Sequence, residues 1–240
     1  MLEVRYADQR GSLDAGWLRS YHTFSFAGYH DPQQMGFSDL RVINDDIVQP
    51  GQGFDTHPHQ DMEIFTYVLA GALEHRDSMG NGSIIRPGDV QMMSAGSGIR
   101  HSEFNPSPTE VVHLLQIWIV PDRLHVEPRY QQAYFADEEK RGHLRLIISP
   151  DAANGSLSVY QDVRVYAGLF DGDERATLSL PPARHAYVHV ARGDLEVNGQ
   201  RLAAGDGARL RAEAAIEVGA GQGAEVLIFD LRAQERPYGR

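Results

Sequence analysis

The strongest constraint on this chain is the regular alternation between short apolar segments and turn-forming residues. Turn signals such as Pro50-Gly51, Pro87-Gly88 and Asn198-Gly199 separate these segments. Because short strands joined by tight turns are typical of sandwiches and barrels, the sequence predicts an all-β protein. The segments with period-two alternation or β-branched apolar runs are residues 40–43, 64–69, 111–120, 144–148, 163–169, 186–190 and 225–230.

Two parts of the chain repeat one pattern. Residues 69–74 resemble residues 190–196, and each segment is followed by a Gly-Asp turn. Both read as strand, glycine turn, strand, and a second turn into another strand, which favours two related barrels. The best helical pattern, at residues 131–141, lies between the two parts. We therefore expect an N-terminal domain at residues 1–130, a connector at 131–146 and a C-terminal domain at 147–232.

Composition narrows the chemistry that the chain can perform. The absence of cysteine excludes disulfides, thiolate metal ligands and a cysteine nucleophile, so nitrogen and oxygen must hold any bound metal. The 33 acidic and 22 basic residues give a formal net charge of −11, which disfavours direct contact with nucleic acid or an anionic membrane. The first residues show no basic segment followed by an apolar one, and we expect a cytoplasmic protein without a membrane span.

Two pairs of candidate metal ligands stand at i, i+2 spacing. His57 and His59 form one pair, and His101 and Glu103 form the other. Side chains two residues apart on a strand share a face, so two such strands facing each other in a barrel would bring three imidazoles and one carboxylate together. Alternatively, the pairs arise by chance among 11 histidines and lie at the surface or in hydrogen bonds. The glycine-rich approaches to both pairs favour the metal site.

The blocks that contain these pairs resemble the two motifs of the cupins. The residues concerned are Gly51, His57, His59 and Glu63 in the first block, and Gly98, His101 and Asn105 in the second. More narrowly, THPHQDMEIFTYVLAGALEHRDSMGN and MMSAGSGIRHSEFNP resemble the pirin family, in particular its bacterial branch with quercetin 2,3-dioxygenase activity. The likeness covers almost the whole chain. It implies a bicupin fold of two β-barrels, each a double-stranded β-helix, with the C-terminal one degenerate.

The resemblance to pirins implies a ligand set of His57, His59, His101 and Glu103 around one divalent metal ion. It indicates Fe(II), while Mn, Co, Ni, Cu or Zn would also suit such ligands. Glu63 is then outside the set of ligands. It is either a second acid or base beside the metal or a solvated strand carboxylate.

The second half has no equivalent of the two ligand pairs. His185 and His189 stand four residues apart in one expected strand, without a matching pair on another strand. We expect them at the surface or in local hydrogen bonds. The sequence thus predicts one metal ion per chain, in the N-terminal domain.

The family's activity implies cleavage of a flavonol such as quercetin by O₂ with release of carbon monoxide. Glu103 is the first candidate for the base that takes up the hydroxyl proton, and Glu63 is the second. The partners are then a small aromatic substrate and O₂. Two alternatives stay open: a non-catalytic, iron-binding, redox-sensing regulator that acts through protein-protein contact, and a metal-stabilised fold with another substrate. We expect a monomer, because two fused barrels can satisfy each other's edges.

Overall fold

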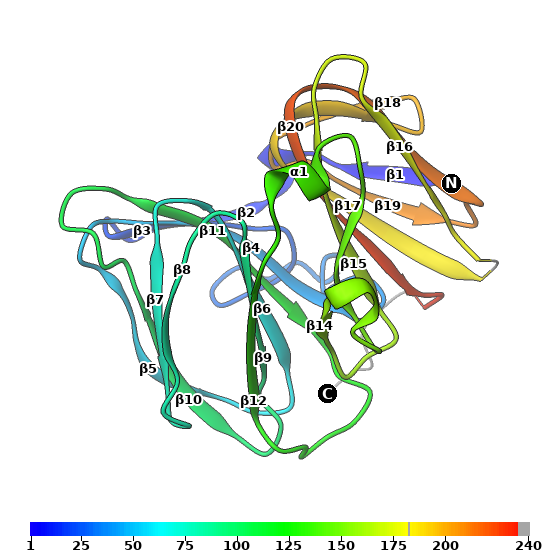
Figure 1. The fold of residues 1–240 in the computed structure, drawn as a ribbon. Coiled ribbons are helices and arrows are strands. Elements are labelled where there is room, and N and C mark those ends of the chain that lie inside the picture. Colours follow the sequence, from blue (N-terminus) through cyan, green and yellow to red (C-terminus); the bar gives the residue numbers. More distant parts are fainter. Residues whose placement is uncertain (182, 235–240) are drawn as a thin grey trace. The chain divides into compact units, whose positions relative to one another are not determined.

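The computed structural model describes residues 1–181 and 183–234, and these are almost entirely strands and turns. In this part of the chain the helical elements are the short η1 (Ala7–Gln9), α1 (Asp137–Lys140) and η2 (Ala153–Gly155), of which α1 is labelled in Figure 1. No described helix has the length and apolar character needed to span a membrane. The prediction of an all-β protein is confirmed.

Spatial proximity divides the chain into two compact units. The first, here called the motif unit, consists of Gly11–Gly36 and Leu40–Tyr134 and contains both ligand blocks. The second, here called the C-terminal unit, consists of Met1–Arg10, Phe37–Asp39 and Phe135–Arg240.

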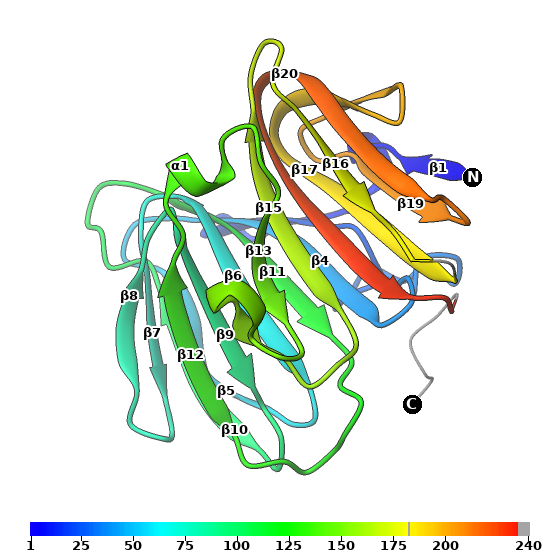
Figure 2. The same cartoon turned by 45° about the vertical axis from the view of Figure 1, so that its right-hand side comes forward.

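The motif unit contains two antiparallel sheets. The larger has seven strands in the order β12-β9-β6-β11-β4-β3-β2, and Figure 2 shows β12, β9 and β6 side by side. The smaller has four strands in the order β5-β10-β7-β8. The strands of the larger sheet are β2 (Gly11–Asp14), β3 (Leu18–His22), β4 (Leu40–Val48), β6 (Glu63–Ala70), β9 (Asp89–Ser94), β11 (Val112–Ile119) and β12 (Arg129–Tyr134). Those of the smaller sheet are β5 (Gly53–His59), β7 (Leu73–Asp77), β8 (Gly82–Ile85) and β10 (Ile99–Phe104).

The two sheets of the motif unit share an apolar core. One cluster joins Val48 and Val68 of the larger sheet to Leu73 and Ile85 of the smaller one. These side chains stand at alternate positions of their strands, so burial of one face of each sheet holds the sheets together. Several inward positions of the same strands carry polar side chains instead: Ser20, His22, Asn44, Asp46, Thr66 and Glu103 are all buried.

The C-terminal unit is built on one nine-stranded sheet. Its main path is β1-β19-β17-β20-β15-β13-β14, with β16 paired to β20 and β18 paired to β17. Its core is apolar and includes Val188, Leu195, Val226 and Ile228. The strands are β1 (Leu2–Arg5), β13 (Arg145–Ser149), β14 (Leu157–Ser158), β15 (Arg164–Phe170), β16 (Arg175–Ser179), β17 (Arg184–Val197), β18 (Gln200–Ala203), β19 (Gly207–Arg211) and β20 (Ala215–Arg232).

All seven segments predicted as strands overlap strands of the structure, but the helical pattern at residues 131–141 is largely wrong. Its first four residues lie in β12, which pairs with β9, and only Asp137–Lys140 is helical. Pairing with a neighbouring strand outweighs a local helical pattern of this length. The N-terminal strand β1 pairs with β19, so the first residues belong to the C-terminal unit in space. The linear domain ranges and the closure of each domain into a barrel stay predictions.

Both histidines of the second half lie on β17. The Nδ1 atom of His185 is 3.2 Å from the carbonyl oxygen of Gln234, and its ring stacks on Phe37. His189 is fully buried. A surface position was therefore wrong for His189, because the centre of β17 lies inside the sheet between β19 and β20. Among the described residues, no group of candidate metal ligands includes either histidine.

Candidate metal centre

Strands β5 and β10 bring the two predicted ligand pairs together. They are antiparallel neighbours, and His57 stands directly opposite His101. A bulge after His101 shifts the register, so that Glu103 stands opposite Phe54. Gly53 is required beside this bulge, because a Cβ atom there would lie 2.2 Å from the carbonyl oxygen of Glu103. The pairing of β5 with β10 therefore brings together candidate ligands that are more than 40 residues apart in the sequence.

Three imidazole rings meet between these strands. The Nε2 atoms of His57 and His101 are 3.1 Å apart. The ring of His59 lies 4.8 Å from each of the other two rings, measured between centroids. Each of the three rings offers one nitrogen, and these nitrogens all lie within 4.8 Å of one another. This spacing allows one ion to contact all three rings.

The protonation state of the cluster suits metal binding. Burial, together with the neighbouring imidazoles, lowers the pKa of His59 to about 4 and that of His101 to about 3. Both rings are therefore neutral near pH 7, and a neutral imidazole has a free nitrogen lone pair for a metal ion.

Glu103 lies beside His101 in a fixed position. Its side chain is 2% exposed. The Gln116 Nε2 atom donates hydrogen bonds to both carboxylate oxygens, at 2.9 Å and 3.2 Å. Thr66 Oγ1 lies 3.4 Å from one of these oxygens and 3.1 Å from Gln116 Oε1. Glu103 thus groups most closely with His101 and His75, next to the triple-histidine cluster.

His75 and Asp77 on β7 form a supporting chain that the sequence argument missed. His75 Nδ1 is 3.4 Å from His101 Nδ1, and His75 Nε2 is 3.2 Å from Asp77 Oδ2. Burial raises the pKa of Asp77, but hydrogen bonds from Asn81 and His75 outweigh it and give a net lowering. The contacts from Asp77 to His75 and from His75 to His101 orient the ring of His101, so that the Nε2 atom of His101 faces His57. The signal for it was the i, i+2 pair of His75 and Asp77.

Glu63 lies on the other face of the larger sheet. It is 1% exposed, and Ser94 Oγ donates a hydrogen bond of 3.0 Å to its carboxylate. Glu63 stands opposite Ser94, while the next pair, Ile64 and Met93, packs inward. Because side chains alternate along a strand, Glu63 points away from the face that carries Thr66. It is neither solvated nor part of a candidate group of metal ligands among the described residues.

Three of the four candidate ligands, His57, His59 and Glu103, line a cavity inside the motif unit with a volume of about 220 Å³. Trp118 stands edge-on to His59, with ring centroids 5.0 Å apart. Apolar and polar side chains both line the cavity, as in sites that bind small molecules. The apolar residues that line the cavity are Leu13, Leu18, Phe26, Ala27, Phe54 and Trp118. The polar residues that line it are Ser20, His22, Asn44, Asp46, His57, His59, Glu103 and Gln116.

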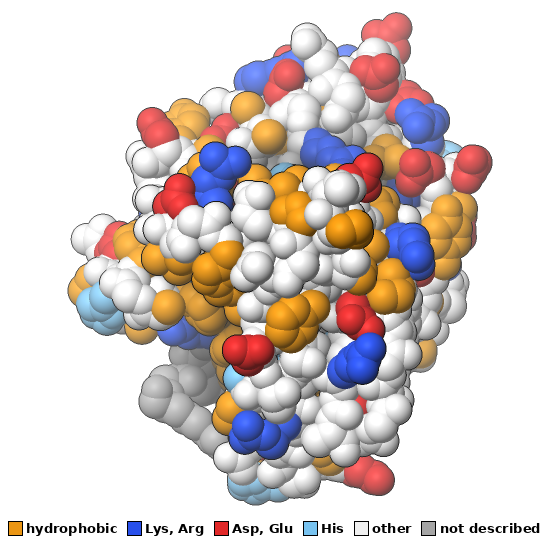
Figure 3. All heavy atoms as spheres, turned by 90° about the vertical axis from the view of Figure 1, so that its left-hand side faces the viewer, with side chains coloured by type: hydrophobic (Ala, Val, Ile, Leu, Met, Phe, Trp, Pro, Cys, Tyr) orange, Lys and Arg blue, Asp and Glu red, His pale blue; other side chains and the backbone are white. Residues whose placement is uncertain are grey.

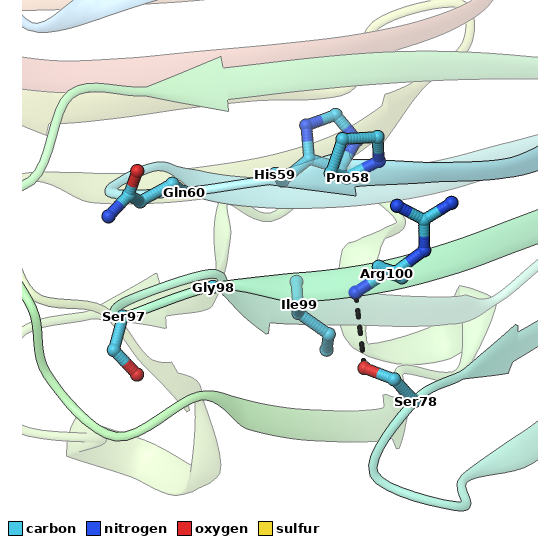
Figure 4. Close-up of a pocket in the computed structure, with 8 residues that line it drawn as sticks. All are labelled: Pro58, His59, Gln60, Ser78, Ser97, Gly98, Ile99 and Arg100. Atoms are coloured by element: carbon cyan, nitrogen blue, oxygen red, sulfur yellow. Dashed lines mark hydrogen bonds between the residues drawn. The ribbon is translucent and has the colours of Figure 1, made fainter.

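A second, open hollow of about 620 Å³ lies where β5 ends and β10 begins. Figure 4 shows Pro58 and His59 on one strand and Ile99 and Arg100 on its neighbour. The backbone N–H of Arg100 donates a 3.1 Å hydrogen bond to the Ser78 hydroxyl. His59 borders both the open hollow and the inner cavity. The triple-histidine cluster is therefore accessible from the surface at His59.

The three imidazoles, together with the carboxylate of Glu103 close to His101, offer nitrogen and oxygen donor atoms. Such a set suits Fe(II), Mn(II), Co(II), Ni(II) or Cu(II). With four protein ligands, an ion that accepts six would keep two positions for other molecules. The arrangement therefore fits a reactive metal centre better than a purely structural one.

Without metal, the protein is expected to lose stability as the pH falls from 7 to 4.5. His59 and His101 titrate near 4 and 3 when folded, against an ordinary value of 6.5. Between these values the unfolded chain binds protons that the folded chain does not, so acid favours unfolding. The measurement is the melting temperature of chelator-treated protein against pH. His101→Gln should flatten the slope, and an unchanged slope would contradict the assignment.

The face of the molecule drawn in Figure 3 has mixed charge. Acidic and basic side chains are interspersed there, with hydrophobic side chains between them. A surface of mixed sign does not build the extended potential that attracts a polyanion.

Comparisons with known proteins find similar sequences over nearly the whole length of the chain. A family model described as pirin matches residues 3–119, and one described as the quercetinase C-terminal cupin domain matches residues 146–231. Quercetin 2,3-dioxygenase of Escherichia coli (strain K12) is 49% identical over 231 residues, which cover 96% of this chain and 99% of that protein. A pirin-like protein of Caulobacter vibrioides is 42% identical, covering 96% of this chain and 99% of that one.

A solved structure of a bacterial pirin is also similar to this chain in fold and in sequence. The bacterial pirin YhhW from Escherichia coli, in complex with nickel(II), superposes with a TM-score of 0.93 and 48% sequence identity. The superposition covers 98% of this chain and 100% of that chain. The likeness thus extends over both halves of the sequence.

Proposed function

The chain belongs to the pirin family, and from this premise we propose that it is a metal-dependent dioxygenase that cleaves a flavonol such as quercetin with O₂ and releases carbon monoxide. We assign the metal ligands as His57, His59, His101 and Glu103. The observation that carries the proposal is the convergence of three imidazoles next to a buried carboxylate, with His57, His59 and Glu103 on the wall of an inner cavity. The similarity to quercetin 2,3-dioxygenase supports the reaction class.

A single divalent ion fits this donor set, and the nickel(II) complex of YhhW supports a divalent metal in the family. We propose Fe(II) as the native ion. When bound, the ion would supply Lewis acidity and a redox partner for O₂.

Glu103 is the proposed base. A carboxylate oxygen of Glu103 would accept the proton of the flavonol 3-hydroxyl, while Gln116 keeps the carboxylate in place through its two hydrogen bonds. The apolar part of the lining, including Phe54 and Trp118, would hold the flat rings and exclude water. Glu63 has no part in this proposal, because its carboxylate lies on the opposite face of the sheet.

Gln116→Leu is expected to weaken metal binding and turnover by about 10- to 100-fold, since loss of a group that orients a metal ligand has this size of effect. The substitution removes both hydrogen bonds to Glu103 at a similar side-chain volume. Metal affinity is measured by competition with a chelator. The control is Gln52→Leu at an exposed glutamine, which should leave the affinity unchanged. Equal metal affinities in the two variants would mean that Gln116 has no role in metal binding.

The proposal is tested by carbon monoxide release from quercetin and O₂. The purified protein is reconstituted in turn with Fe(II), Mn(II), Co(II), Ni(II) and Cu(II). His57→Ala is the control, because quercetin also autoxidises. Release that requires both metal and His57 would support the flavonol dioxygenase. One metal ion per chain without release above the control would contradict it and favour another substrate or a redox-sensing binding role.

A further inference from the structure

Strands β3 and β4 carry a row of four polar side chains on the inner face of the larger sheet. Ser20 stands opposite Asp46, and His22 stands opposite Asn44. All four side chains are buried, with exposed fractions between 2% and 4%. They occupy the same alternating positions as the apolar Val48, so the strand pattern turns them toward the interior.

Three of the four side chains form hydrogen bonds with one another. His22 Nδ1 lies 2.9 Å from Asn44 Oδ1 and 3.4 Å from Ser20 Oγ. The Asp46 carboxylate takes a hydrogen bond from the Ser20 side chain. Its Oδ1 atom, however, is buried without a hydrogen-bond partner among the described residues. A buried carboxylate oxygen without a donor is destabilising, so a natural partner for it is a group that enters the site.

Asp46 lines the same inner cavity as His57, His59 and Glu103. The histidines lie on the smaller sheet of the motif unit, and Asp46 lies on the larger one. A flat molecule held at the ligand cluster would therefore extend toward the sheet that carries Asp46. The Asp46 carboxylate is the acidic group of the lining that lies outside the assigned ligands.

On the basis of the proposed function, we propose that Asp46 Oδ1 accepts a hydrogen bond from a substrate hydroxyl and selects polyhydroxylated aromatic substrates over otherwise similar ones without that hydroxyl. A site built around a hydroxyl rejects an analogue that lacks it, because the buried acceptor then stays unpaired.

The electrostatic surroundings of Asp46 agree with a need for such a donor. Burial raises the pKa of Asp46 to about 7, and the charges of Asp45 and Glu103 add to this effect, while the hydrogen bond from Ser20 opposes it. A hydroxyl group that donates to the carboxylate would stabilise its charged form.

The test compares two flavonols that share the 3-hydroxyl and the 4-carbonyl group. Quercetin carries four hydroxyl groups besides the 3-hydroxyl, and 3-hydroxyflavone carries none of them. Both are titrated without O₂ into nickel(II)-loaded protein, and the dissociation constants are measured by fluorescence quenching. Asp46→Leu should weaken quercetin binding at least about 10-fold, because hydrogen bonds to charged groups are strong, and should change 3-hydroxyflavone binding less than about twofold.

The matched control is Asp45→Leu, the same substitution on the other face of β4, where the carboxylate pairs with His113 at 2.6 Å. It should leave both dissociation constants unchanged. If Asp46→Leu does not fold, Asp46→Asn preserves the volume and should still weaken quercetin selectively, by about threefold or more.

Equal losses for both flavonols, or no loss, would overturn the role of Asp46 and leave the proposed function standing. Wild-type protein that binds metal but neither flavonol would overturn the proposed function, and this inference with it.

Discussion

His101→Ala is expected to remove the bound metal and the oxygenase activity together. His101 is the central member of the cluster, since its Nε2 atom faces His57 and its Nδ1 atom faces His75. It is also buried, with 2% of its surface exposed. Loss of a supporting residue around a metal lowers affinity 10- to 100-fold, and loss of a ligand should cost at least about 100-fold.

Metal content per chain and carbon monoxide release are the two measurements for His101→Ala. The control is His185→Ala on β17 of the C-terminal unit, which should retain both. Full metal content in His101→Ala would mean that the ligands are assigned wrongly. Loss of metal in His185→Ala would mean that the C-terminal unit contributes a site of its own.

Glu103→Gln should lower carbon monoxide release by about 10²- to 10⁴-fold, the range that a positioned base contributes. The amide keeps the volume and one acceptor oxygen for Gln116, but it cannot take up a proton and is a weaker ligand. Metal content should therefore fall less than turnover does. Steady-state rates and metal content of the same preparation separate the two effects.

Glu63→Gln is the matched control for this carboxylate. Glu63 is as deeply buried as Glu103, but it is bonded to Ser94 on the opposite face of the sheet. The variant should keep turnover within about twofold of the wild type. A loss as large as that of Glu103→Gln would transfer the role of the base to Glu63.

The strands and the ligand pairs could be predicted because both depend on a local pattern. A nearly continuous apolar run marks the strand 64–69 within β6, and the alternation of side chains along a strand puts His57 and His59 on one face. The sequence predicted two strands that face each other across a barrel, whereas β5 and β10 are neighbours in one sheet, and this pairing brings His57 and His101 together. The i, i+2 spacing was the informative signal.

The rest of the site depends on which strands become neighbours, and the local sequence does not specify this. His75 supports His101 only because β7 pairs with β10. Asp46 lines the cavity because β4 lies between β3 and β11. The burial of Glu63 likewise depends on its pairing with Ser94 across β6 and β9. Polar residues at alternate positions of otherwise apolar strands were the available signal for these groups.

A crystal structure of the nickel(II)-loaded protein would locate the bound ion. We expect one ion per chain, bound by the side chains of His57, His59, His101 and Glu103 at about 2.0 to 2.2 Å, the usual length for imidazole and carboxylate ligands. An ion bound elsewhere, or one held by His75 in place of His57 or His59, would contradict this assignment.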